Sequence, residues 1–222
     1  YATGAGVFLI LSLVLMTGQR GRPHKTALML ASLVSAVWLG VAAYCISEDL
    51  SLLPAYLLEP LRNLALFAFL IRVLSAAYRQ PAEASGYFRR TLSLFASLSL
   101  LMMALVLYRV AASHPVAVPA GIDFLLAGFL VMAITGLVLV EQVIRNARSE
   151  SRRSVKFLCM GLGALFAYDF YLYSQALLFQ EIDQAIWNAR GFINALVVPV
   201  IGIAAVRDPH WSLDIFVSRR VV

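Results

Sequence analysis

The stretch IDFLLAGFLVMAITGLVLVEQVIRNARSESRRSVK, residues 122–156, joins an apolar run to a basic segment. Residues 122–144 are almost entirely apolar, and the twelve residues that follow carry five Lys or Arg side chains. A helix needs about 20 apolar residues to cross the hydrocarbon core of a bilayer. Cytoplasmic loops of membrane proteins keep an excess of Lys and Arg. This stretch therefore predicts a membrane-spanning helix followed by a cytoplasmic loop.

The same alternation of apolar runs and basic gaps extends over the whole chain. We expect spans over residues 2–17, 26–46, 60–78, 91–112, 122–144, 155–179 and 190–206. Fifteen of the eighteen Lys and Arg residues lie in alternate gaps: Arg20, Arg22, Lys25, Arg72, Arg79, Arg89, Arg90, Arg145, Arg148, Arg152, Arg153, Lys156, Arg207, Arg219 and Arg220. The pattern predicts an all-α, polytopic membrane helical bundle of seven transmembrane helices, with the amino terminus outside and the carboxyl terminus inside (N-out/C-in).

Composition leads to the same class of protein. The 222-residue chain is 61% hydrophobic and only 14% charged, with a mean hydropathy of +0.83. Soluble domains carry about 25% charged residues. The net charge of +6 arises from basic residues beside the expected spans, so we assign it to topology and to contacts with anionic lipids rather than to nucleic acid. The lipid bilayer is thus the first expected partner.

Cysteine and histidine usage predicts neither a disulfide nor a metal site. The expected topology places Cys45 near the outer end of one span and Cys159 near the inner end of another. Bridged cysteines need Cα atoms within about 7 Å, and the three scattered histidines form no ligand cluster. No catalytic residues are predicted in this segment. The chain begins inside an apolar run and without Met, so we expect further residues upstream.

One carboxylate is expected near the middle of a span. Asp169 lies within LFAYDFYLY, residues 165–173, and a charge at the bilayer centre costs about 2.5–3.5 kcal/mol on insertion scales. It should therefore face the bundle and find a partner, with Tyr173 one helical turn away on the same face. The candidate partners come from two other spans: Arg62, Asn63, Arg190 and Asn194.

Two interpretations of this cluster remain open. The functional one is a polar, tyrosine-lined pocket that opens outward and binds a ligand or responds to protonation. The structural one is a buried ion-pair network that fixes helix packing. Pro199, inside the last expected span, removes one backbone hydrogen bond and is a candidate hinge.

The final third of the chain resembles a known family. The stretches KFLCMGLGALFAYDFYLYSQALLF (156–179), ARGFINALVVPV (189–200) and DPHWSLDIFVSRRVV (208–222) are similar to the membrane region of PrsK-type sensor histidine kinases, which are associated with PEP-CTERM/exosortase systems. Residues 1–155 agree with that family in hydropathy and number of spans.

The resemblance implies a transmembrane sensor in the bacterial inner (cytoplasmic) membrane. Residues 1–206 would form the seven-helix sensor domain, and residues 207–222 the cytoplasmic connector to GAF-like and histidine kinase regions beyond this segment. Such a protein would act as a homodimer and signal to a response regulator of exopolysaccharide and PEP-CTERM genes. No cofactor is expected in this segment, whereas the kinase region would use ATP and Mg.

The expected signal is an unknown small molecule or lipid, received in the outer leaflet or periplasm and relayed through the seventh span. The alternative is a small transporter or channel that uses Asp169 with Arg62 or Arg190 as its substrate or proton site.

Overall fold

A computed structural model describes residues 1–17, 23–75, 81–111, 123–147 and 152–207. Over these residues the chain is all-helical, as predicted, with α1 (Ala2–Thr17), α2 (Pro23–Ser47), α3 (Leu53–Ser75), α4 (Pro81–Ala111), α5 (Phe124–Asn146), α6 (Arg152–Phe179) and α7 (Gln184–Arg207). Of these, α2, α4, α5, α6 and α7 are long and apolar enough to cross a membrane. The predicted class of membrane helical bundle agrees with these five helices.

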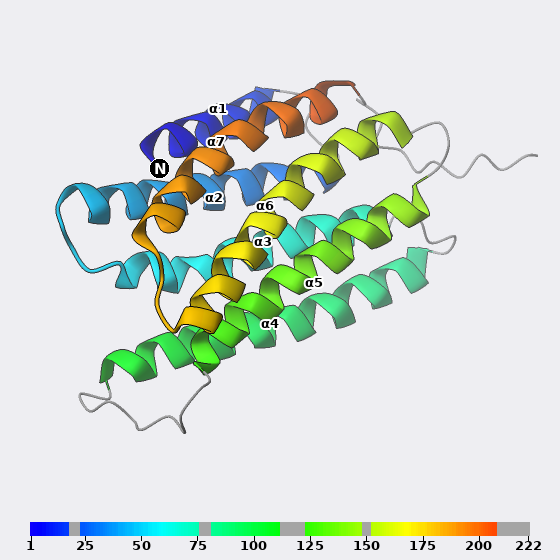
Figure 1. The fold of residues 1–222 in the computed structure, drawn as a ribbon. Coiled ribbons are helices and arrows are strands. Elements are labelled where there is room, and N and C mark those ends of the chain that lie inside the picture. Colours follow the sequence, from blue (N-terminus) through cyan, green and yellow to red (C-terminus); the bar gives the residue numbers. More distant parts are fainter. Residues whose placement is uncertain (18–22, 76–80, 112–122, 148–151, 208–222) are drawn as a thin grey trace, which may run out of the picture.

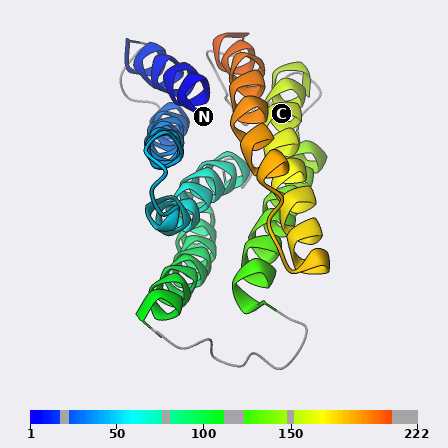
Figure 2. The ribbon, with the colours of Figure 1, turned by 60° about the vertical axis from the view of Figure 1, so that its left-hand side comes forward.

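The helices run side by side along one common direction (Figure 1). Each helix packs on its neighbour in sequence, and α1 also packs on α7, so the chain closes into a ring. The exception to a simple ring is α3, which also contacts α5 and crosses from the α2 side of the bundle toward it (Figure 2). This central position gives α3 the most enclosed apolar side chains, including Phe67, Phe69, Leu70 and Ile71, each 0% exposed.

Polar residues set where two of the helices begin. Asp123 caps α5, since its carboxylate accepts hydrogen bonds from the backbone N–H groups of Leu125 and Leu126. Asp183 does the same for α7, accepting from Ala185 and Ile186. Such caps satisfy N–H groups that have no partner within the helix. At the end of α6, Gln180 takes a left-handed conformation with φ of 59°, a common way to end a helix.

Three helices begin well before the spans expected from the sequence. The helix α3 begins at Leu53, not at residue 60, and Pro60 lies inside it. The helix α4 begins at Pro81, ten residues before the apolar run, because a helix can continue past the apolar segment into the basic one. The helix α7 begins at Gln184 because Asp183 caps it there. In each case the expected span locates the middle of the helix but not its first residue.

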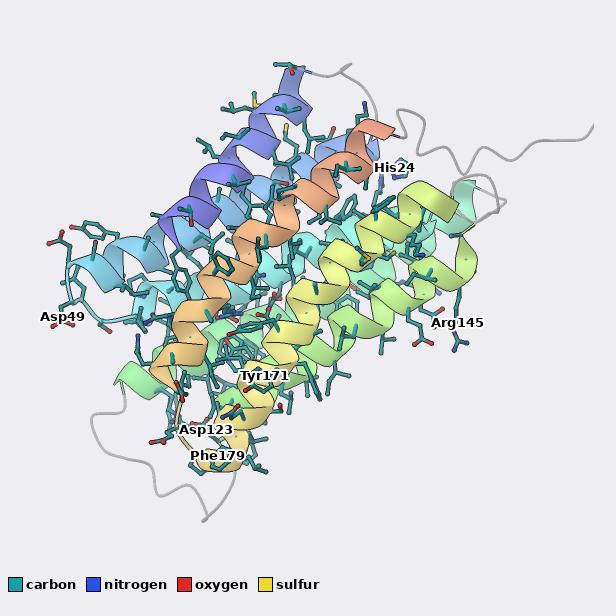
Figure 3. All side chains as sticks on the ribbon, turned by 45° about the horizontal axis from the view of Figure 1, so that its top comes forward. His24, Asp49, Asp123, Arg145, Tyr171 and Phe179 are labelled. Carbon is teal, nitrogen blue, oxygen red and sulfur yellow. The ribbon has the colours of Figure 1, made fainter. Side chains whose placement is uncertain are left out.

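The two ends of the bundle differ in charge. His24 and Arg145 lie at one end, whereas Asp49, Asp123 and Phe179 lie at the other (Figure 3). At the acidic end, an ion pair of 2.7 Å between Arg109 and Asp123 joins α4 to α5. Of the expected connector 207–222, Arg207 ends α7 and the remaining residues lie outside the described ones.

Candidate functional site

Four ionisable side chains from three helices meet in the interior of the bundle. Glu59 and Arg62 lie three residues apart on α3 and so share a face. Asp169 comes from α6 and Arg190 from α7. All four are at most 2% exposed. Glu59 and Arg190 each lie about 9 Å along their helix from its first residue, at 1.5 Å per residue, so the cluster lies toward the acidic end.

Asp169 bridges the two arginines. Its Oδ2 accepts a hydrogen bond from Arg62 Nη1 at 3.1 Å, and its Oδ1 accepts from Arg190 Nε at 2.8 Å. Each carboxylate oxygen therefore faces a different helix. One side chain of α6 thus holds α3 and α7 together.

Arg190 completes the cluster through Glu59. Its Nη1 donates to Glu59 Oε2 at 3.1 Å, and its Nη2 donates to Glu59 Oε1. Two parallel hydrogen bonds between a guanidinium and a carboxylate give a strong, geometrically specific pair. Two carboxylates and two guanidiniums leave the cluster with no formal net charge.

Neutral polar groups extend this network. The Tyr173 hydroxyl donates to Glu59 Oε1 at 2.5 Å, and Arg62 Nη2 donates to Asn194 Oδ1 at 3.3 Å. The amide of Asn194 donates in turn to the carbonyl of Arg190, one turn earlier on α7, at 2.8 Å. We call the six residues Glu59, Arg62, Asp169, Tyr173, Arg190 and Asn194 the buried polar network.

Aromatic rings enclose the guanidiniums of the buried polar network. Trp38 of α2 lies under both, with its ring centroid 4.5 Å from the Arg62 Cζ and 4.7 Å from the Arg190 Cζ. Trp187 lies 5.3 Å from the Arg190 Cζ and packs on Tyr56. Cation–π contacts of this kind gain strength when the cation is desolvated. The guanidiniums are thus compensated by ring faces as well as by carboxylates.

The aromatic layer also ties the first helix to the last. Tyr1 packs against the rings of Trp38 and Trp187, and its hydroxyl donates to the Trp187 carbonyl at 2.6 Å. Trp38 Nε1 donates to the Ala55 carbonyl at 3.0 Å. Through these contacts α1 and α2 surround the network that α3, α6 and α7 build.

The network leaves a few buried atoms at its edge unpaired. Among the described residues, Arg62 Nε, Asn63 Oδ1 and Trp187 Nε1 are buried without a hydrogen-bond partner. A buried polar atom without a partner costs about 1–3 kcal/mol. The carboxylates are therefore fully paired, whereas donors and an acceptor at the edge are free to take new partners.

The predicted cluster exists, although it is closed. Asp169 has both of its predicted arginine partners, and Tyr173 and Asn194 join the same network. Asn63 is buried on α3 beside it, but its Oδ1 makes no hydrogen bond. In place of the predicted pocket that opens outward, the structure encloses the network, whose residues are each at most 2% exposed.

Sequence reasoning missed two essential members of the site. The expected spans 26–46 and 60–78 leave Glu59 in the outside gap between them, yet it is 0% exposed within α3. Trp38 was not singled out, because an apolar span gives no signal that one of its rings lies under two cations. The spacing of Glu59 and Arg62 was the available signal, since residues three apart on a helix share a face.

Other predicted positions are in place but lie apart from the network. Pro199 is an exposed residue in the interior of α7. Cys45 and Cys159 are both buried and free. No group of three or more His, Cys, Asp or Glu side chains within the described ranges could hold a metal ion.

Comparison with protein-family models, with curated proteins and with solved structures finds no match to this chain.

Proposed function

We propose that the chain is the transmembrane input module of a sensor histidine kinase, in which the buried polar network couples a signal to α7. The single observation that carries this proposal is the position of Arg190. This side chain of α7 pairs with Glu59 of α3 and with Asp169 of α6. A stimulus that changes either ion pair would change the position of α7 relative to α3 and α6. Among the described helices, α7 lies nearest the expected connector.

The energies involved are adequate for such a relay. A coupling between two sites of a protein is typically about 1–3 kcal/mol, and a charge-assisted hydrogen bond contributes about 1.5–3 kcal/mol. Exchange of one such bond in the network therefore suffices to shift the equilibrium between two arrangements of α7. The unpaired Arg62 Nε and Trp187 Nε1 supply donors for a second arrangement.

The proposal includes seven spans and an N-out/C-in orientation. The five long apolar helices support a membrane location, and α1 and α3 pack alongside them. The charges of α3 lie toward other helices rather than lipid, which permits this helix to cross. His24 and Arg145 at one end (Figure 3) support a cytoplasmic position for that end.

The remaining parts of the proposal depend on the family resemblance. They are a bacterial inner-membrane location, a homodimer, GAF-like and kinase regions after Val222 that use ATP and Mg, and a response regulator of exopolysaccharide and PEP-CTERM genes. The alternative of a small transporter or channel has less support, since Asp169, Arg62 and Arg190 are enclosed and already paired with one another.

Autophosphorylation of the complete protein tests this function. Membranes that contain the wild type or Asp169→Asn are incubated with ATP and Mg²⁺, and phosphate on the protein is measured. We expect Asp169→Asn to change the output about fivefold or more, the lower range of a typical coupling. Glu141→Gln is the matched control, because Glu141 lies 54% exposed in a surface ion pair.

Two results would contradict the proposal. One is a folded Asp169→Asn protein whose output equals that of the wild type and of Glu141→Gln. The other is a coding sequence after Val222 that contains no kinase region.

A further inference from the structure

A groove separates α1 from the second half of α7. It has a volume of about 450 Å³ and is lined along most of its length by apolar side chains. On α1 these include Ile10 and Val14, which are 60% and 50% exposed. On α7 the lining residues include Pro199 and Gly202. The groove is thus an elongated apolar surface on the outside of the bundle.

The packing of the two helices explains why the groove lies at one end. Near the start of α1, a Cβ atom on Gly191 would lie 2.6 Å from the Tyr1 backbone nitrogen, so the helices touch there. Further along, a Cβ atom on Gly202 would first meet Leu11 at 3.8 Å, an ordinary contact. The pair is therefore tight near the acidic end and open near the basic end.

The basic end of the groove has a positive charge. Lys25 of α2 lines it beside Thr17, and no carboxylate among the described residues forms an ion pair with Lys25. An apolar channel that ends at a cation with no ion-pair partner in the described part of the chain matches a molecule with a hydrocarbon chain and an anionic head. Lysines beside membrane helices attract anionic headgroups in the same way.

We infer that this groove is a binding site for one anionic phospholipid, with an acyl chain between α1 and α7 and its phosphate at Lys25. The groove is separate from the buried polar network, so the inference does not depend on the signalling proposal. It also assigns a place to the lipid: beside Pro199, where α7 has lost a backbone hydrogen bond.

Native mass spectrometry of the purified chain in detergent tests the site. The probes are phosphatidylglycerol, which is anionic, and phosphatidylcholine, which has no net charge. We expect tighter binding of phosphatidylglycerol to the wild type. Lys25→Gln should weaken the binding of phosphatidylglycerol about fivefold, the contribution of one lysine near an anionic surface, and weaken the binding of phosphatidylcholine less, because its choline group balances the phosphate charge. Gly202→Leu, which fills the groove, should weaken the binding of both lipids.

Matched controls separate the site from general effects. Lys156→Gln removes the only other lysine, which is exposed on α6 away from the groove. Gly40→Leu adds the same side chain where a Cβ atom would meet nothing within 4 Å. Both controls should bind as the wild type does.

Three outcomes would overturn the inference. The first is equal loss of phosphatidylglycerol in Lys25→Gln and Lys156→Gln, and the second is unchanged binding in folded Gly202→Leu. The third is a Gly202→Leu variant that no longer forms a dimer but still binds lipid. That result would assign the groove to a second copy of the chain. If Gly202→Leu does not fold, the comparison of the two lysine variants decides.

Discussion

At the scale of single residues, the charge balance of the buried polar network explains how four ionisable groups persist inside an apolar bundle. Taking ions out of water costs several kcal/mol for each one, and attraction between them offsets that cost only with good geometry. Here every carboxylate oxygen of Glu59 and Asp169 accepts at least one hydrogen bond. Removing the charge of any one of the four ionisable residues leaves an oppositely charged side chain buried without its full complement of partners.

Asp169→Asn should therefore destabilise the protein by about 3–5 kcal/mol, the usual cost of breaking a buried ion pair. The two buried cations Arg62 and Arg190 would then be balanced by a single carboxylate, that of Glu59, which pairs with Arg190. The double variant Arg62→Gln with Asp169→Asn restores charge balance and should recover part of that loss. Unfolding in detergent, followed by circular dichroism, measures both. Equal stability of the single and double variants would show that the charges do not interact.

Trp38 provides a second prediction. Trp38→Phe loses the hydrogen bond to the Ala55 carbonyl, worth about 1 kcal/mol, but keeps an aromatic face under the two guanidiniums. Trp38→Leu loses that face as well, which should cost about 4 kcal/mol more, at about 2 kcal/mol for each of two desolvated cation–π contacts. The same unfolding measurement separates them, with Tyr44→Leu as the control because Tyr44 is 61% exposed. An equal loss of stability in Trp38→Phe and Trp38→Leu would rule out the cation–π contribution.

A residue of the network could be predicted from the sequence only where a polar side chain lies inside an otherwise apolar span. Asp169 is a carboxylate in an apolar span, so the sequence alone required a partner for it. Glu59 is a charged residue directly before the expected third span, so the charge pattern leaves it in the outside gap. Contacts with other helices, rather than local preference, hold the turns before Pro60: the Ala55 carbonyl accepts a hydrogen bond from Trp38 of α2, and Glu59 pairs with Arg190 of α7. Trp38 gave no signal because its role depends on where α3 and α7 lie.

At the scale of helices, close contacts of small residues set the packing. Gly136 of α5 faces Phe166 of α6, and a Cβ atom there would lie 2.4 Å from the ring. Phe166 is 0% exposed and stacks on Phe67 of α3, so it has no room to move away. The ring of Phe166 thus joins three helices at the position of one glycine.

Gly136→Ala should accordingly destabilise the bundle by about 1–3 kcal/mol through overpacking. Adding Phe166→Leu should relieve part of that loss by removing the ring. The control is Gly40→Ala, where the added Cβ atom meets nothing within 4 Å. Thermal unfolding in detergent measures the effect. A Gly136→Ala protein as stable as Gly40→Ala would contradict this packing.

Pro199 gives a prediction about the element that carries the proposed signal. Pro199→Ala restores a backbone N–H inside α7 and removes a local weak point. We expect a more stable protein whose kinase output responds less to Asp169→Asn, since a stiffer α7 bends less. Autophosphorylation of the single and double variants measures this, and an undiminished response would remove the hinge from the mechanism.

At the scale of the whole molecule, the ring of helices closed by α1 and α7 has one basic and one acidic end (Figure 3). Each expected span corresponds to one helix in the described residues, and five of these helices are long and apolar enough to cross a membrane. The long-range contacts that close the ring could not be predicted, since tertiary packing decides them. The proposed orientation follows from the charge difference alone.

Labelling of single cysteines tests that orientation directly. In a variant with Cys45→Ala and Cys159→Ala, Asp49→Cys and Arg145→Cys each place one thiol at an opposite end of the bundle. In intact cells, a maleimide that cannot cross the inner membrane should label the Asp49→Cys protein and not the Arg145→Cys protein. Lysed cells, in which both should react, are the control. The reverse pattern would invert the bundle, move the buried polar network to the cytoplasmic half, and remove the argument that it receives signals from outside.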